Sequence, residues 1–151
     1  MSAMTELDRL VTIRAIEELK ARYFRTLDTK DWAGYRDVFT SDLVADFRDS
    51  AGERNEAMLT HGSEAYVAGL SAMLQHVVTV HHGHMAEIEV HSATEASGIW
   101  AMEDKLWVPE GSPLPFRFMH GYGHYHERYV RLDDGWRISA IRLSRLRVDV
   151  A

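Results

Sequence analysis

The sequence contains no cysteine. This absence excludes disulfides, thiolate metal sites and cysteine nucleophiles. Basic charge is also scarce, because 17 lysines and arginines face 23 acidic residues and the net charge is −6. Nucleic-acid-binding proteins usually carry a basic stripe, so we expect no nucleic-acid partner. No apolar run approaches membrane length and MSAMTELDRL lacks the apolar core of a signal peptide, so we expect a cytoplasmic protein without membrane attachment.

The composition is ordinary for a globular domain. A chain of 151 residues is long enough to bury a sizeable core, and 46% of its residues are hydrophobic and 26% charged. The sequence has no internal repeat, low-complexity tract or evident linker. We therefore predict a single domain that spans residues 1–151.

The first half of the chain shows helical spacing. Apolar residues recur every three to four positions and predict a long amphipathic helix over Thr5–Leu27, with Thr5 as its N-cap. Asp31 is the predicted N-cap of a second, short helix that carries Trp32, Tyr35, Val38 and Phe39. The other elements predicted in this half are a short strand at Leu43–Phe47 and a third helix over Glu64–Gln75, which Ser63 would cap.

The second half changes to strand-like runs separated by turn residues. Helices followed by a meander of long antiparallel strands are typical of an α+β fold, and long strands in a small protein must curl around something. We therefore predict a cone-shaped α+β barrel, in which N-terminal helices pack in a strongly curved, mostly antiparallel sheet. The predicted strands are Val77–His91, Thr94–Val108, Phe116–Leu132 and Trp136–Val148, the last two joined by the turn Asp133-Asp134-Gly135.

Three polar side chains interrupt the apolar faces of these strands. Alternate residues of a strand share one face, so Asp104 lies on the face of Met102 and Arg145 lies on the face of Leu143. His81 falls in the middle of a third apolar strand. Burying an unpaired charge costs several kcal/mol or more, so such residues need partners or a purpose. Together they indicate one polar pocket inside an apolar body.

Four phrases of the sequence resemble a known family: ELKARYFRTLDTKDW, HHGHMAEIEV, A-x-G-I-W-A-M-E-D and Y-x-R-x-D-D-G-W-R-I. They are similar to the SnoaL-like branch of the nuclear-transport-factor-2-like superfamily, and the resemblance covers nearly the whole chain. The members it suggests are bile-acid 7α-dehydratase, scytalone dehydratase and hexachlorocyclohexane dehydrochlorinase, with ketosteroid isomerase more distant. The resemblance implies the cone fold and chemistry without a cofactor.

The resemblance also implies a set of working residues. The positions that match the bile-acid dehydratase pattern hold Tyr23, Asp28, His81, Asp104 and Arg145. In this pattern His81 is the general base and Asp28 orients its imidazole. Tyr23 donates a hydrogen bond to a substrate oxygen, and Asp104 and Arg145 shape the polar end of the pocket.

Each of these residues also has a purely structural interpretation. A histidine on a strand is often a core residue that donates a hydrogen bond to a backbone carbonyl, and this structural interpretation also fits His81. Asp28 could make a local turn after the helix, and Tyr23 could be an ordinary core tyrosine. Asp104 and Arg145 could form a buried ion pair without a chemical role.

The function we predict is a cofactor-independent lyase that performs a dehydratase-type elimination on a hydrophobic, polycyclic or steroid-like small molecule. Leu27 and Phe47 stand where scytalone dehydratase has pocket tyrosines, which argues against scytalone itself. One alternative is a polyketide cyclase or a ketosteroid-type isomerase with the same pocket, and another is a non-catalytic ligand-binding or assembly module. The resemblance further implies a homo-oligomer, a trimer rather than a dimer. The candidates for the apolar lining are Trp100, Met102, Phe118 and Met119.

The nine histidines raise the question of a metal. His82-Gly-His84-x-x-Glu87 has the spacing of a cupin-like site, and His124-x-His126 repeats the alternation. Cupins are all-β proteins, whereas this chain begins with helices. We therefore predict neither a metal nor another cofactor.

Overall fold

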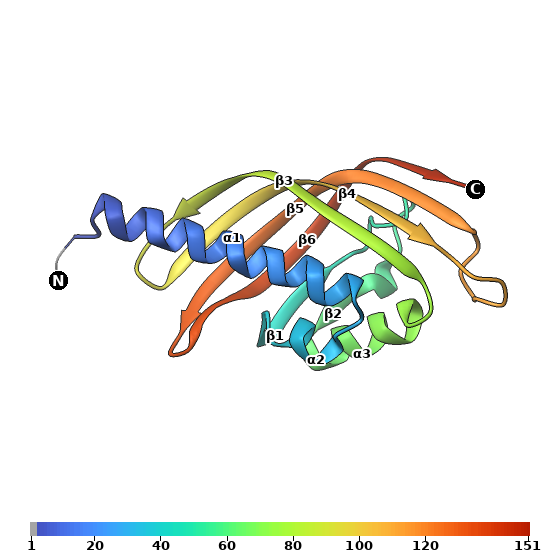
Figure 1. Cartoon of the computed structure of the whole chain (residues 1–151), viewed down its shortest axis with the longest axis horizontal. Coiled ribbons are helices and arrows are strands. Elements are labelled where there is room, and N and C mark those ends of the chain that lie inside the picture. The colour runs from blue at the N-terminus through green and yellow to red at the C-terminus, as the bar shows by residue number, and fades with distance from the viewer. Residues whose placement is uncertain (1–2) are drawn as a thin grey trace.

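The structure, a computed structural model, describes residues 3–151. Three helices pack on one face of a single six-stranded sheet with the strand order β2-β1-β6-β5-β4-β3 (Figure 1). This arrangement confirms the predicted α+β fold. The elements are α1 (Glu6–Asp28), α2 (Trp32–Arg36), β1 (Phe39–Asp46), a 3-10 helix (Glu56–Met58), β2 (Leu59–His61), α3 (Ser63–Leu74), β3 (Val78–Val90), β4 (Glu95–Trp107), β5 (Phe118–Leu132) and β6 (Gly135–Val150).

The sheet register aligns the predicted polar residues. Strands β3 to β6 form an antiparallel meander, and among the described strands only β1 and β6 pair in parallel. His81 lies opposite Asp104, Asp104 lies opposite Gly121, and Gly123 lies opposite Arg145. Residues opposite each other in an antiparallel pair share a face. The register therefore brings three polar residues from β3, β4 and β6 into one row on the inner face.

Helix α1 runs along the inner face of the curved sheet, and α2 and α3 lie near its C-terminal end (Figure 1). Its apolar stripe is buried, including Ile16, Leu19, Tyr23 and Leu27. This burial, rather than helix propensity, provides most of the stability of an amphipathic helix. No helix within residues 3–151 is long and apolar enough to cross a membrane.

The ends of the helices confirm two predicted caps and correct a third. The Thr5 hydroxyl accepts a hydrogen bond from the Asp8 backbone N–H at 3.1 Å, and the Asp8 carboxylate accepts the Thr5 backbone N–H at 2.9 Å. Asp31 caps α2 through its carboxylate. The predicted cap at Ser63 is wrong: Ser63 is the first helical residue of α3, and Gly62 precedes it with φ +92° and no side-chain cap.

The segment after α2 also differs from the prediction. Val38 and Phe39 are not helical, because α2 ends at Arg36 and β1 already begins at Phe39. The Val38 carbonyl accepts the Ile138 N–H at 2.9 Å, and Phe39 pairs with Ile138 in β6. Val38 and Phe39 fit both the helical period and the strand period of apolar residues, and their pairing with β6 selects the strand. The 3-10 helix and β2 were not predicted.

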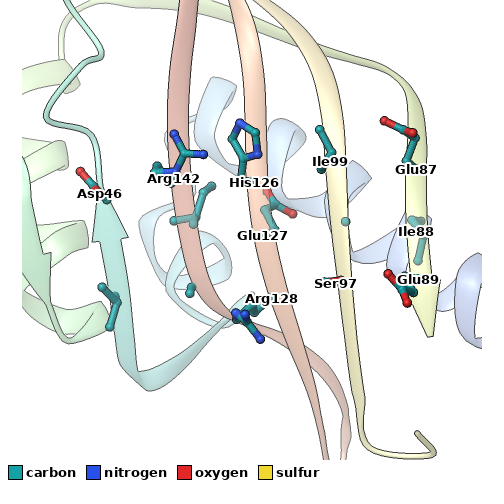
Figure 2. Close-up of a pocket in the computed structure, with 14 residues that line it drawn as sticks. Asp46, Glu87, Ile88, Glu89, Ser97, Ile99, His126, Glu127, Arg128 and Arg142 are labelled. Carbon is teal, nitrogen blue, oxygen red and sulfur yellow. The ribbon is translucent and has the colours of Figure 1, made fainter. Parts of the chain in front are cut away.

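The outer face of the sheet, opposite α1, carries several charged side chains beside apolar ones such as Ile99 (Figure 2). A groove of about 660 Å³ crosses it from β3 to β1. Glu87 and Glu89 of β3 lie on one side, Arg128 of β5 and Arg142 of β6 lie in the middle, and Asp46 of β1 lies on the other side. Acidic edges thus flank a basic centre.

Candidate active site

A cavity of about 290 Å³ lies between α1, α3 and the inner face of the sheet. Its lining is mostly apolar, as is usual for small-molecule sites. The polar side chains that reach it include Tyr23, His81, Asp104, Tyr125 and Arg145. The apolar side chains include Leu27, Phe47, Met58, Met73, Leu106 and Met119.

Only one of the four predicted lining candidates reaches this cavity, namely Met119. The Trp100 indole instead donates to the Tyr129 hydroxyl at 2.8 Å within the core. Met102 packs beside the Arg145 guanidinium, and Phe118 packs on the ring of Trp107. The prediction failed for Trp100 and Met102 because strand parity gives the face of a residue and not its position along the cone. It failed for Phe118 because this side chain lies on the outer face of β5, opposite that of Met119.

His81 and Asp28 form a hydrogen-bonded pair. The Nδ1 atom of His81 lies 2.7 Å from Oδ1 of Asp28. The imidazole is only 8% exposed, and its Nε2 lies 3.9 Å from Oδ2 of Asp104. Because an ionised carboxylate only accepts, Asp28 favours a proton on Nδ1 and leaves Nε2 free to act as a base. This is the geometry of a histidine that a carboxylate orients.

Asp28 is itself held in place by β3. Its Oδ2 accepts the His81 backbone N–H at 2.9 Å, and its Oδ1 accepts the Thr79 hydroxyl at 2.9 Å. The Lys30 ammonium in turn donates to the Thr79 hydroxyl at 2.7 Å. Asp28 is the last residue of α1 and does not line the cavity. Its place is behind His81, where it joins the helix end to the strand.

Asp104 and Arg145 form a two-pronged ion pair at the cavity wall. Nη1 and Nη2 of Arg145 donate to the two carboxylate oxygens of Asp104 at 2.6 and 3.0 Å. Each side chain is 6% exposed. Arg145 Nε also donates to the Ser50 carbonyl at 2.8 Å, which fastens the loop after β1 over the cavity. Arg145 is thus largely committed to protein partners, and Asp104 is the member that faces His81.

Tyr23 and Tyr125 meet at the cavity, although only Tyr23 was predicted. Their ring centroids are 5.7 Å apart, and each residue is 1% exposed. Burial is the main cause that raises the pKa of both hydroxyls well above the ordinary value, so both are neutral donors. Tyr125 was missed because an aromatic residue on an apolar strand face breaks no pattern. The structure therefore brings four of the five predicted residues to the cavity, places Asp28 behind His81, and adds Tyr125.

The histidines of the alternative metal site point elsewhere. His82 and His84 lie outside the cavity, with side chains 60% and 57% exposed. His124 and His126 have ring centroids 6.4 Å apart, and His126 Nε2 lies 2.9 Å from the Ser144 hydroxyl. Among residues 3–151, no group of three or more histidine, aspartate or glutamate side chains is arranged to hold a metal ion.

Comparisons with known proteins agree with this architecture. Residues 8–142 match the SnoaL-like domain. The probable cyclase FGR4 of Gibberella zeae is 25% identical over 141 residues, which cover 87% of this chain and 89% of that protein. A candidate scytalone dehydratase from Novosphingobium aromaticivorans has a TM-score of 0.82 and 21% identity, with 97% of this chain and 92% of the other covered. A type 2 hexachlorocyclohexane dehydrochlorinase has a TM-score of 0.80 and 19% identity, with 97% and 93% covered.

The two structural likenesses describe the fold, whereas the domain match defines the family. It spans most of the chain, from the first turns of α1 to the middle of β6. Of the five predicted residues it includes all but Arg145, which lies three positions beyond its end. The chain therefore belongs to the SnoaL-like domain family, within the nuclear-transport-factor-2-like superfamily.

Proposed function

We propose that this protein is a cofactor-independent lyase that removes water from a hydrophobic small molecule. The observation that carries the proposal is the contact of 2.7 Å between His81 Nδ1 and Asp28 Oδ1, in an imidazole that is nearly buried at the cavity. A base at this place can accept a proton from carbon in an apolar environment. Neighbours named as a dehydratase, a dehydrochlorinase and a cyclase support an enzyme of the lyase, cyclase or isomerase kind.

The proposed reaction begins at a carbon next to a carbonyl group. His81 Nε2 takes the proton, and the electrons of the broken C–H bond pass toward the carbonyl oxygen. Tyr23 donates a hydrogen bond to that oxygen as its negative charge grows. The enolate then re-forms the carbonyl, a double bond forms between the α- and β-carbons, and the C–O bond at the β-carbon breaks. The departing hydroxyl group takes the proton held on His81 and leaves as water. Asp28 stabilises the imidazolium between the two steps.

The proposed substrate is a ring compound with few polar groups. The cavity is largely apolar, and its volume of about 290 Å³ is near the lower end of the range for small-molecule sites. A compact fused ring system fits this volume better than a long steroid side chain. Asp104, paired with Arg145, would bind a hydroxyl group of the substrate close to the base.

A cyclase or isomerase is the second candidate, favoured by the similarity to the probable cyclase over most of both chains. Both reactions share the first proton transfer with elimination, and they differ from it in the later steps. Elimination releases water, whereas isomerisation and ring closure by aldol addition leave the mass unchanged.

The proposal is tested by incubating the protein in D₂O with β-hydroxy ketones built on steroid, terpenoid and aromatic polyketide skeletons. Mass spectrometry then measures the loss of water from each substrate, and deuterium in recovered substrate or in a product of otherwise unchanged mass reports proton removal without elimination. We expect water loss for at least one compact skeleton. Binding with neither water loss nor deuterium uptake across the panel would instead support a non-catalytic binding module.

The first prediction concerns the dyad. His81→Ala should lower kcat by about 10²–10⁴-fold, the range for loss of a general base. Asp28→Asn should be of similar severity, because an amide no longer enforces the proton on Nδ1. Tyr23→Phe should have a smaller effect, since it removes one hydrogen bond and leaves the base intact. Steady-state kinetics on the substrate found in the screen measure all three.

The matched control is His82→Ala, which removes the neighbouring imidazole on the exposed side of the same strand. Circular dichroism must show that each variant is folded, because His81 and Tyr23 are buried. A folded His81→Ala variant with wild-type turnover would remove His81 from the mechanism. The cavity carboxylate of Asp104 would then be the remaining base.

A further inference from the structure

A buried ion pair lies directly behind the tyrosines of the site. Lys20 is on α1, one turn before Tyr23, and is 1% exposed, while the Glu127 side chain on β5 is fully buried. The Lys20 ammonium donates to Oε1 of Glu127, and the Tyr129 hydroxyl donates to Oε2 at 2.5 Å. Burying two charges requires several kcal/mol of desolvation, and an apolar pair often stabilises a protein as well or better. The placement of this pair therefore calls for a reason beyond stability.

The ammonium group of Lys20 rests on aromatic faces. Its Nζ atom lies 3.6 Å from the ring centroid of Tyr23 and 3.8 Å from that of Tyr125. A third ring, that of Phe24, lies at 4.9 Å. Tyr23 and Tyr125 line the cavity, whereas Lys20 does not. The two phenol rings thus separate the cation from the substrate space, and the positive member of the ion pair is the one that touches them.

A cation on the face of a phenol changes the chemistry of its hydroxyl. The positive charge draws electron density from the ring and stabilises negative charge on the phenol oxygen, an effect that is strong where water is excluded. Burial acts in the opposite direction, because it raises the pKa of both tyrosines and makes them weaker acids. Lys20 is the only lysine or arginine in residues 3–151 with a cation–π contact to these rings. Burial lowers the pKa of Lys20 to about 8, against the opposing effect of the Glu127 carboxylate, so the ammonium is charged at neutral pH. We expect this charge to offset part of the effect of burial, and at Tyr125 the charge of Arg145 also lowers the pKa.

We propose that Lys20 is a positioning residue that strengthens the hydroxyls of Tyr23 and Tyr125 as hydrogen-bond donors to a substrate oxygen that gains negative charge. The inference rests on the proposed function for the use of these donors, but its electrostatic part belongs to the protein alone. It assigns to the site an ionic group that never touches the substrate. The same arrangement predicts a preference for substrates whose reaction passes through an enolate.

The test measures the acidity of the tyrosines directly. All six tyrosines are replaced biosynthetically by 2,3,5,6-tetrafluorotyrosine, and each is titrated by ¹⁹F NMR. This strongly acidic analogue is chosen so that the phenols at positions 23 and 125 ionise while Lys20, whose pKa burial lowers to about 8, still carries its charge. The variant is Lys20→Met combined with Glu127→Gln, which removes both charges and leaves an amide oxygen for Tyr129. We expect the proton affinity of positions 23 and 125 to rise about tenfold, the size of a desolvated cation–π contact. Tyr122, on the opposite face of β5, should not change.

Two controls make the result specific. Lys105→Met removes a lysine from the outer face of β4 and should leave positions 23 and 125 unchanged. If the double variant does not fold, Lys20→Gln replaces it, because a glutamine can still donate to Glu127 without carrying a charge. Equal proton affinities in wild type and variant at positions 23 and 125 would overturn the inference.

Kinetics separate this inference from the proposed function. With a substrate from the screen, the double variant should lower kcat about tenfold at unchanged KM, and the loss should shrink in a Tyr23→Phe background. Changed acidity together with an active Tyr23→Phe variant would contradict the role of Tyr23 and leave the Lys20 effect standing. Unchanged acidity together with an inactive Tyr23→Phe variant would contradict the Lys20 effect alone.

Discussion

At the scale of single residues, Gly121 shows how closely the site is packed. It lies opposite Asp104 on the inner face of β5. A Cβ atom at this position would overlap the Arg145 guanidinium and lie 2.5 Å from Oδ1 of Asp104. Because Gly121 has no side chain, the ion pair between Asp104 on β4 and Arg145 on β6 can pass over the intervening strand β5.

We predict that Gly121→Ala displaces the ion pair. The added methyl group should cost about 1–3 kcal/mol, as overpacking typically does, and should weaken ligand binding by moving Asp104. Urea denaturation measures the first effect and a thermal shift with a bound ligand measures the second. Gly69→Ala is the matched control, because nothing lies within 4 Å of a Cβ there; in a helix it should stabilise slightly. Two variants of equal stability would contradict the packing argument.

The sequence predicts part of the site because some of its residues break a pattern. Asp104 and Arg145 are conspicuous on apolar strand faces, whereas Tyr125 fits such a face and gives no signal. Lys20 gives little signal of a buried role, since a lysine on a helix usually extends its ammonium to water. Glu127 offered a usable signal, because it is a charged residue on the same inner strand face as Tyr125, just as Asp104 is a charged residue on the apolar face of β4. Pairing it with Lys20 requires the structure, since 107 positions separate them.

At the scale of secondary-structure elements, the start of α3 depends on the backbone rather than on a capping side chain. Gly62 has φ +92°, a conformation that residues with a Cβ atom adopt only with strain. Its N–H donates to the Leu43 carbonyl of β1 at 2.7 Å, so it also anchors the helix to the sheet. The entry into α3 therefore requires glycine.

We predict that Gly62→Ala lowers the free energy of unfolding by about 1–2 kcal/mol, the strain of a left-handed conformation. Ser63→Ala should have the smaller effect, because its hydroxyl makes no capping hydrogen bond. Chemical denaturation of both variants compares them. A larger loss for Ser63→Ala would restore the serine as the functional cap.

The long elements were predicted closely, whereas the short elements α2 and β1 were predicted with wrong bounds and the 3-10 helix and β2 were missed. Sustained periodicity marks α1 and the strands β3 to β6, and their observed ends differ from the predicted ones by at most two residues. Strand β2 has three residues, Leu59–His61, too few for an alternation to show. The parallel contact of β1 with β6 joins residues about 100 positions apart. Tertiary pairing decides such contacts, and no local pattern encodes them.

At the scale of the whole molecule, the outer face of the sheet is the surface through which we expect copies of the chain to associate. We propose a homo-oligomer, a trimer rather than a dimer, that forms through this face. The groove in Figure 2 has acidic edges at Glu87 and Glu89 and a basic centre at Arg128 and Arg142, which suits contact between copies of one chain.

We predict that Arg142→Glu weakens this assembly, because it places an acidic group at the basic centre. Sedimentation velocity at micromolar concentration should give a trimer for wild type and smaller species for the variant. The cavity lies on the other face and should keep its ligand affinity. Arg14→Glu, on the exposed side of α1, is the matched control. A wild-type monomer at these concentrations would contradict the proposal.

The helix α1 also limits how the chain can change in length. Within nine residues it carries the cation at Lys20, the donor at Tyr23 and the carboxylate at Asp28, with no interruption. Each inserted residue would turn everything before it by about 100° and shift it by about 1.5 Å relative to Asp28, which Thr79 and His81 hold in place. Residues 20–28 therefore form a segment of fixed length. Insertions and deletions are better accommodated at residues 91–94 between β3 and β4, which contribute nothing to the cavity.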